Sequence, residues 1–265
     1  MRKRFLPHIG YREMAGQRGF TMVELMVAML IGVIVLAAIY ATHNLQQATY
    51  RNQTMVTNTQ QNLRGAMYMM QRDLLMAGYD PTSSGRFGIE DITKLNNNSA
   101  IEITADNGPG ASADNGTVDA GETIAYQIFD SPQTSTVGNF DLGRSVDGGD
   151  PVLIAEGIEA LGLAYAYDAD GDGELDRSGG NVIWAVDSDN DNRLDTTLEG
   201  GAVNIDPDDI RAVRIWLLGR TRGPVMNRDL TNRPDYVVAE RVVSADDNYD
   251  RRLLTATINL RNLGL

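Results

Sequence analysis

A single uninterrupted apolar segment constrains this chain more than any other feature. Residues 20–41 read FTMVELMVAMLIGVIVLAAIYA, and Glu24 is the only charged residue among them. At about 1.5 Å per residue, such a helix spans the roughly 30 Å hydrocarbon core of a bilayer. Residues 1–19 carry five basic side chains against one acidic. The positive-inside rule therefore predicts a cytoplasmic N-terminus and an exported body.

Three kinds of segment share this length and apolar character. A cleaved secretory signal needs a shorter apolar run closed by small residues, and Ile39, Tyr40 and His43 do not form such a site. A plain membrane anchor explains the length but gives no reason for Glu24. An ionisable residue inside a membrane span costs roughly 2.5 kcal/mol or more at its centre, so this carboxylate is a functional hypothesis.

The third kind of segment explains the carboxylate. Residues 19–25, GFTMVEL, together with the apolar run behind them, resemble the class III signal of type IV prepilins and type II secretion pseudopilins. In that family a prepilin peptidase cuts after the glycine and methylates the new N-terminus. The resemblance implies cleavage between Gly19 and Phe20, with Phe20 N-methylated. It also implies that Glu24 pairs with the N-terminal amine of a neighbouring subunit, which would give a carboxylate in lipid the partner it needs.

The leader of 19 residues is long for this family. Met14 begins a shorter basic leader, MAGQRG, of the kind that the family shows more often. Translation from Met14 is therefore an alternative to translation from Met1. Peptides from residues 2–13 in the unprocessed precursor would exclude the shorter leader.

Helical periodicity continues beyond the apolar segment. Residues 42–77 contain no proline and one glycine, Gly65, and their apolar residues recur at three- and four-residue steps. Gly78 and Pro81 then predict the end of the helix. The predicted domains are a basic leader over 1–19, a transmembrane half-helix over 20–41, an amphipathic half-helix over 42–78 and a β-rich head over 79–265.

The head alternates short apolar runs with stretches rich in Gly, Asp and Asn. Strands joined by loops rather than helices favour antiparallel pairing. We therefore expect an α+β protein, with the long N-terminal helix packed on a mostly antiparallel sheet and with Ile158–Tyr167 and Ala212–Leu218 in the core. The predicted strands are Ala100–Thr104, Glu122–Asp130, Val152–Ala155, Ile158–Asp168, Val182–Val186, Arg211–Arg220, Tyr236–Val243 and Leu253–Leu260.

Two further segments resemble one branch of the pilin superfamily. Residues 71–81, QRDLLMAGYDP, resemble the helix-ending stretch of PilW-like minor pilins, whose relatives in type II secretion are the J-type minor pseudopilins. Residues 251–263, RRLLTATINLRNL, resemble the basic last strand of the same proteins. The resemblance implies a minor pilin that co-assembles with other minor pilins to prime a type IV pilus, and it leaves open a place at the pilus tip. A J-type minor pseudopilin and a calcium-dependent tip adhesin are the alternatives.

The same resemblance implies a location and a set of partners. The protein would lie in the inner membrane as a single-pass protein with a periplasmic head, and would reach the pilus and the cell surface after assembly. The implied partners are prepilin peptidase, other minor pilins or pseudopilins, the major pilin, the inner-membrane assembly platform and the lipid bilayer.

Composition excludes several classes of function. The 265-residue chain has no cysteine, two histidines near its N-terminus and a net charge of −13, of which residues 20–265 carry −17. Disulfides, thiolate metal sites and cysteine nucleophiles are therefore excluded, as is a histidine triad in the head. An acidic chain also lacks the basic surface that binds nucleic acid. Lys3 and Lys94 are the only lysines, which argues against serine–lysine catalysis, and we expect no enzyme. The resemblance implies instead that the chain is a substrate of prepilin peptidase.

Two aspartate-rich loops carry the remaining chemistry. Residues 168–176, DADGDGELD, match the front of an EF-hand calcium loop, with carboxylates at alternate positions and a glycine at the sharp turn. Residues 187–195, DSDNDNRLD, repeat this pattern with Asn192 at the turn. Neither loop has the bidentate glutamate of position 12. The predicted Ca2+ ligands are Asp168, Asp170, Asp172, Glu174, Asp176, Asp187, Asp189, Asp191 and Asp195.

A metal-free interpretation of these loops is available, because Asp, Asn and Gly favour turns without any ion. Against it, alternating carboxylates repel one another unless a cation lies between them. A third match over 111–122 is poorer, since Ala111 and Ala113 occupy its first two ligand positions. We expect structural calcium sites with a Kd of order 10⁻⁴ to 10⁻³ M.

Overall fold

The computed structural model describes residues 19–95, 97–132, 141–226 and 233–264. The expected leader before Gly19, including the alternative start at Met14, lies outside the described residues. The chain divides into two compact units, Met1–Ala48 and Thr49–Leu265. Helix α1 (Met22–Leu74) begins in the first unit and ends in the second.

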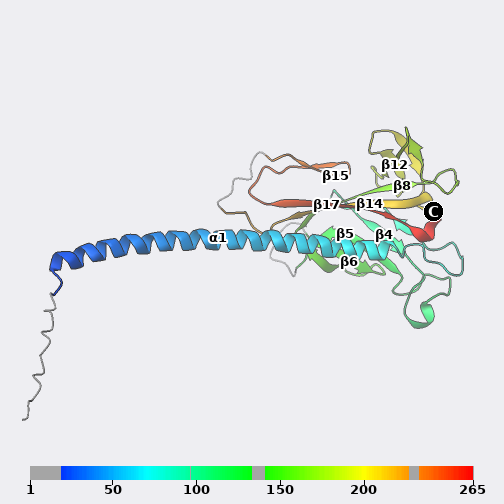
Figure 1. The fold of residues 1–265 in the computed structure, drawn as a ribbon. Helices are drawn as coiled ribbons and strands as arrows, with labels where there is room; N and C mark the ends of the chain where they lie inside the picture. The colour runs from blue at the N-terminus through cyan, green and yellow to red at the C-terminus, as the bar shows by residue number, and fades with distance from the viewer. Residues whose placement is uncertain (1–18, 96, 133–140, 227–232, 265) are drawn as a thin grey trace, which may run out of the picture. The chain divides into compact units, whose positions relative to one another are not determined.

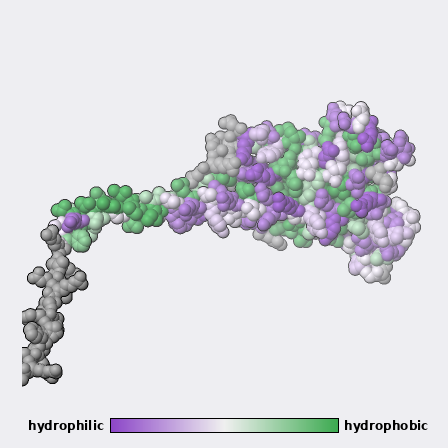
Figure 2. Space-filling view, in the orientation of Figure 1, coloured by the Kyte–Doolittle hydropathy of each residue, from purple (hydrophilic) through white to green (hydrophobic). Residues whose placement is uncertain are grey.

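The part of α1 in the first unit is exposed on almost all sides. Its large apolar side chains include Leu30, at 64% exposure, and Leu36, at 67%. Figure 2 shows hydrophobic residues covering this segment and hydrophilic residues replacing them further along the helix. The apolar segment of the sequence is thus one continuous helix whose side chains find no core within their own unit.

The part of α1 in the second unit buries one face. Its buried apolar residues recur at helical spacing, which places them on a single stripe. Figure 1 shows this part of the helix running along the sheets of the second unit. The buried apolar residues of the stripe are Leu63, Ala66, Met67, Met70 and Leu74.

The helix ends slightly earlier than the sequence predicts. Regular α-helix stops at Leu74 rather than at Ala77. The chain then tightens, because the amide of Ala77 donates to the carbonyl of Leu74 at 3.2 Å, three residues back. Gly78 follows with φ +73, the left-handed conformation that a glycine stop requires.

A five-stranded antiparallel sheet forms one layer of the second unit, in the order β1-β4-β5-β6-β7. Its inner residues join the apolar stripe of α1 in the main core. The strands of this sheet are β1 (Ile89–Asp91), β4 (Ile101–Thr104), β5 (Thr123–Phe129), β6 (Asp141–Val146) and β7 (Val152–Glu156).

A six-stranded antiparallel sheet forms the other layer, in the order β13-β12-β11-β8-β14-β17. Its strands are β13 (Ala202–Ile205), β12 (Leu194–Thr197), β11 (Ala185–Val186), β8 (Ile158–Tyr167), β14 (Ile210–Arg220) and β17 (Arg251–Asn259). Three small pairs complete the second unit: β2 (Lys94–Leu95) with β3 (Asn98–Ser99), β9 (Arg177–Ser178) with β10 (Asn181–Val182), and β15 (Tyr236–Val238) with β16 (Arg241–Val243).

The expected core strands lie at the centre of this sheet. Every residue of β8 is buried. One face joins the main core, and the other is covered by two smaller clusters, one that contains Trp184 and Val186 and one that contains Val238 and Val243. The α+β class with a long N-terminal helix and antiparallel pairing is confirmed. The strands form two principal sheets, whereas the sequence predicted one.

Several strand predictions need correction. Tyr236–Val243 is a hairpin rather than one strand, because Ala239 turns the chain with φ +52. Val182–Val186 is split between β10 and β11. The predicted strands do not include β1, β2, β3, β6, β9, β12 or β13, because these segments are too polar or too short for a period of two to stand out.

A buried polar cluster fixes the end of α1 to the five-stranded sheet. Asp73, 5% exposed, accepts hydrogen bonds from Tyr126 Oη at 2.7 Å and from Arg144 Nε at 2.7 Å. Arg72 adds an ion pair of 2.9 Å from the exposed side. Burial alone raises the pKa of Asp73, but hydrogen bonds from Tyr126, Arg144 and Arg72 outweigh it and hold the pKa below its ordinary value.

Candidate functional site

The apolar helix begins at a turn that caps itself. Glu24 Oε2 accepts hydrogen bonds from the amide and the hydroxyl of Thr21, both at 2.8 Å, and Thr21 Oγ1 accepts one from the Glu24 amide at 3.2 Å. This arrangement is a capping box. Gly19 and Phe20 lie before it and are exposed, Phe20 to 89%. The peptide bond between them therefore lies in an accessible stretch directly before the first helical turn.

Helix α1 is the one helix in the described part of the chain that is long and apolar enough to cross a membrane. Its most apolar window lies near the N-terminus and is not buried at all. Exposed apolar surface on this scale marks contact with a membrane or with other proteins. By its length and composition, the first half of α1 is therefore suited to anchor the chain in a membrane.

The first aspartate loop brings three of its five predicted ligands together. Carboxylate oxygens of Asp168, Asp170 and Asp172 lie within 4.8 Å of one another. Asp168 is buried, and the other two are exposed. Glu174 and Asp176 lie outside this group, and Asp176 instead accepts a hydrogen bond from a backbone amide of the loop at 3.2 Å.

Asp168 organises this loop from its buried position. Its Oδ1 accepts the Gly171 amide at 2.8 Å, and its Oδ2 accepts the Gly173 amide at 2.9 Å. Both glycines have positive φ, +72 and +85, so the chain can wrap around the carboxylate. The spacing of aspartates and glycines predicted a tight turn here, and in the structure the loop turns around the Asp168 carboxylate.

The second aspartate loop also assembles three carboxylates, but not the same positions. Oxygens of Asp187, Asp189 and Asp195 lie within 4.8 Å of one another. Asp191 lies outside this group, and its Oδ1 accepts the Arg193 amide at 2.9 Å. Of the nine predicted ligands, six therefore fall into two groups of three.

Asparagines attach the second loop to the segment that holds β1 and β2, a role that the sequence did not predict. Asn192 Oδ1 accepts the Ile92 amide at 3.0 Å, and its Nδ2 donates to the Glu90 carbonyl at 2.9 Å. Asn190 makes the same two-way contact with the backbone of Lys94. The partners are about a hundred positions earlier in the chain, so no local sequence signal could have identified this contact.

The two buried aspartates differ in electrostatics. Burial raises the pKa of Asp168, but backbone hydrogen bonds from Gly173 and Gly171 outweigh it, so the net shift is downward. Burial also raises the pKa of Asp187. Backbone hydrogen bonds from Asn190 and Asn192 lower it, but burial together with the charges of Asp191 and Asp195 outweighs them, so the net shift is upward. Asp187 therefore holds its negative charge at a greater cost than Asp168 does.

The donor set of both groups fits a hard divalent cation. Carboxylate oxygens are the ligands that calcium prefers, and three oxygens within 4.8 Å can share one ion. Both acidic clusters could therefore hold a metal ion. In the poorer third match, both oxygens of buried Glu122 accept backbone amides, Gly108 at 2.9 Å and Asp119 at 2.7 Å.

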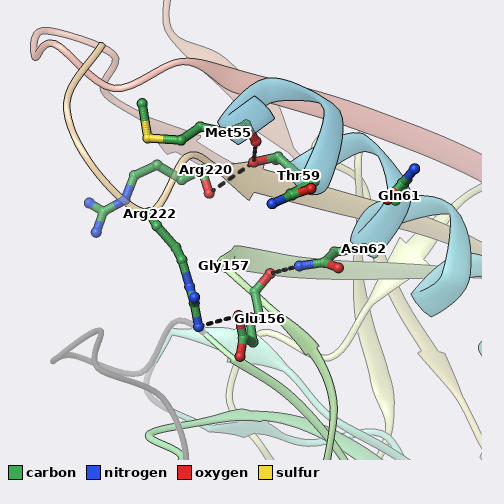
Figure 3. A pocket seen from close by; sticks show the side chains of 9 residues that line it. Met55, Thr59, Gln61, Asn62, Glu156, Gly157, Arg220 and Arg222 are labelled. Atoms are coloured by element: carbon green, nitrogen blue, oxygen red, sulfur yellow. Dashed lines mark hydrogen bonds and ion pairs between the residues drawn. The ribbon is translucent and has the colours of Figure 1, made fainter. Parts of the chain in front are cut away.

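A small polar cavity of about 150 Å³ lies between α1 and the turn that joins β7 to β8. Figure 3 shows its lining side chains, with Asn62 Nδ2 donating to the Glu156 carbonyl at 3.0 Å. Arg222 pairs with the carboxylate of Glu156, and both residues line the cavity. A cavity this small and polar suits water or a single side chain rather than a substrate.

Comparisons with known proteins give two family matches. Residues 14–40 match the model of the prokaryotic N-terminal methylation motif. Residues 140–262 match the model of the type IV pilus-assembly protein W. None of the curated proteins matches the chain. Among solved structures, a type IV-like pilin from Thermus thermophilus is similar at 15% identity and a TM-score of 0.46, with 77% of this chain and 96% of that chain covered.

Proposed function

We propose that this chain, a type IV pilin-like protein with a PilW domain, is a minor pilin that co-assembles with other minor pilins to prime a type IV pilus, with a place at the pilus tip. The observation that carries the proposal is the methylation motif at the exposed start of an exposed apolar helix, ahead of a PilW domain. This is the arrangement of a protein that is anchored in a membrane first and joins a fibre through its helix afterwards.

The proposed domain division follows from that observation. Residues 1–19 are a leader, 20–41 the transmembrane half of the helix, 42–78 its amphipathic half and 79–265 the head. Prepilin peptidase would cut between Gly19 and Phe20 and methylate Phe20. The N-terminus would lie in the cytoplasm and the head in the periplasm, because the basic residues precede the apolar segment.

Glu24 is the residue that we propose for subunit recognition. Within the chain its carboxylate caps the first turn through Thr21. In a fibre, the methylated amine of a neighbouring Phe20 would supply a positive charge, and a carboxylate in lipid without such a charge is costly. The proposed partners are other minor pilins, the major pilin and the inner-membrane assembly platform. No catalytic role is proposed for the chain itself.

Co-purification tests this function. The full-length chain, produced in its own cell with each candidate minor pilin, should recover those subunits from detergent-solubilised membranes. Glu24→Gln should lower the recovery at least about tenfold, because the charge pair is lost. Glu24→Asp keeps the charge and is the matched control. Failure of the unmodified chain to recover any pilin-like subunit would contradict the proposal.

A type II secretion role is the alternative within the same superfamily. A J-type minor pseudopilin would prime a short periplasmic fibre by the same mechanism. Deletion of the chain separates the two, since loss of surface pili supports the pilus and loss of protein export with intact pili supports the pseudopilus.

For the two acidic clusters we propose structural calcium. A cation shared by Asp168, Asp170 and Asp172, or by Asp187, Asp189 and Asp195, would offset the repulsion among their charges. At 1 mM calcium, a site with a Kd of 10⁻³ to 10⁻⁴ M would add about 0.4 to 1.4 kcal/mol to the free energy of unfolding.

Thermal melting of the full chain with calcium and with a chelator tests the calcium sites. The unfolding midpoint should rise with calcium, and the double change Asp170→Asn with Asp189→Asn should remove the rise. Asp246→Asn, an exposed aspartate outside both clusters, is the matched control and should leave it unchanged. An unmoved midpoint at millimolar calcium would refute structural sites.

A further inference from the structure

We propose that the free edge of β17 is a docking site for an extended acidic segment of another pilin-like subunit, which adds a strand to the six-stranded sheet. The inference rests on the proposed function, because it names a surface of the head through which a co-assembling subunit is held. Addition of a strand to an exposed sheet edge is a general mode of protein recognition.

β17 presents one row of backbone groups to its neighbour and another row to solvent. It is the last strand of the sheet and pairs with β14 through nine consecutive residue pairs. The Leu260 amide donates to the Arg211 carbonyl at 2.8 Å, which fixes the alternation of the ladder. Even-numbered residues of β17 therefore bond to β14, and odd-numbered residues direct their amides and carbonyls outward. The outward residues are Arg251, Leu253, Thr255, Thr257 and Asn259.

Most of this outward row is free within the described part of the chain. The Arg251 carbonyl accepts a hydrogen bond from Tyr236 Oη at 3.2 Å. No described residue reaches the outward backbone groups of the four residues beyond it. Leu253, Thr255 and Thr257 are exposed, so an incoming backbone can approach them.

The other edges of the two sheets are protected, and this one is not. Natural proteins blunt exposed edges with short strands and bulges. β1 and β13 have three and four residues, and the pairings of β1, β7 and β13 each contain a register shift. β17 has nine residues and a regular register, without proline. An unprotected long edge is an aggregation hazard unless a partner covers it.

Charge indicates which partner fits. Residues 251–265 contain three arginines and no acidic side chain, although residues 20–265 together carry −17. Arg251 is buried and paired with Glu159 and Asp247, so its charge is already balanced within the head. Arg252, 3.6 Å from Asp250, and Arg261 are exposed near the two ends of the free edge. Complementary charge sets the register and the choice of partner. The edge therefore suits a strand with acidic side chains near its ends and repels another basic strand.

Amide hydrogen exchange of the ¹⁵N-labelled full chain in detergent tests this edge. Each purified pilin-like subunit from the same cell is added in excess as the probe. Addition should slow exchange at Leu253, Thr255, Thr257 and Asn259 at least tenfold. Exchange at the even-numbered residues, which already bond to β14, should not change. Only an added strand produces this alternating pattern.

Two variants provide the matched control. Thr255→Pro removes one outward amide, places a ring in the path of the incoming strand and spares the bonds to β14, so it should abolish the slowing. Thr255→Val keeps the amide and should preserve it. If the proline disrupts the sheet, the even-numbered amides of this variant will exchange faster. The alternating pattern in the unmodified chain then shows whether a strand is added at β17.

The remaining outcomes separate this surface from the proposed function. If a subunit binds but slows amide exchange elsewhere on the chain, the docking site at β17 is refuted and the proposed minor-pilin role is not affected. Absence of binding by every pilin-like subunit overturns both. If the alternating pattern of slowed exchange appears when the chain alone is concentrated, the edge binds a second copy of this chain. That result refutes the proposed acidic partner.

Discussion

Helix α1 carries two different surfaces on one continuous backbone. In the first unit Leu30 is 64% exposed among other apolar side chains, whereas in the second unit Leu74 is fully buried and the opposite face is polar. The helical geometry is the same in both parts, and the difference lies in whether apolar residues surround the helix or follow one stripe. A stripe needs a protein core, but an all-round apolar surface needs lipid or other helices.

Truncation of a side chain in the buried stripe should change the free energy of unfolding more than any other substitution that compares the two parts of α1. Leu74→Ala removes a fully buried side chain and should lower the free energy of unfolding of the head by about 2–5 kcal/mol. Leu30→Ala, at an exposed position, should change it by less than about 0.5 kcal/mol. Denaturant unfolding of the full chain in detergent measures both, because the two tryptophans, Trp184 and Trp216, lie in the head. Equal effects would mean that the two parts of α1 are not distinct.

Removal of the buried charge at the end of the helix should have the next largest effect. Asp73→Asn leaves Arg144 without its charged partner and should cost about 1.5–3 kcal/mol. Arg72→Gln, whose side chain is more than half exposed, should cost less than about 1 kcal/mol in the same unfolding experiment.

The same carboxylate predicts a pH dependence. The pKa of Asp73 in the folded state lies below its ordinary value of 3.8, so its contribution is present above pH 3.8 and is lost as the pH falls through the folded-state pKa. The unfolding midpoint of Asp73→Asn should therefore fall less steeply below pH 3.8 than that of the unmodified chain. Parallel curves would show that Asp73 is not stabilised in the fold.

Glycine substitution should give the smallest effect. Gly65 and Gly32 both lie within α1, and a methyl group at either position would meet no other atom within 4 Å. Gly65→Ala, in the part that packs on the head, should stabilise the head by about 0.5–1 kcal/mol. Gly32→Ala should leave head unfolding unchanged. A gain from Gly32→Ala would show that the whole helix unfolds together with the head.

Local patterns predicted the elements that depend on local chemistry. The apolar run and the helical stripe specify α1, because hydropathy and a 3.6-residue period are properties of neighbouring residues. The apolar, β-branched and aromatic runs of β8 and β14 likewise identified the central strands. Polar strands such as β12 are stabilised by pairing with neighbouring strands, here β11 and β13, and no local sequence pattern marks them.

Long-range contacts account for most of what the sequence could not give. The aspartate spacing predicted two loops with clustered carboxylates, and the structure brings three together in each. The sequence could not predict that Asn190 and Asn192 attach one loop to the segment beside β1. Nor could it predict that Arg144 donates a hydrogen bond to Asp73, which lies 71 positions earlier. Such contacts depend on which strands become neighbours, which is a property of the whole fold.

Mass spectrometry of the N-terminal peptide from isolated fibres tests the central claim most directly. The account predicts a peptide that begins at N-methylated Phe20, recovered from the fibre fraction in amounts far below those of the major subunit. A peptide that retains Gly19 and residues before it, or absence of the chain from the fibres, would contradict the assignment of this protein as a minor pilin.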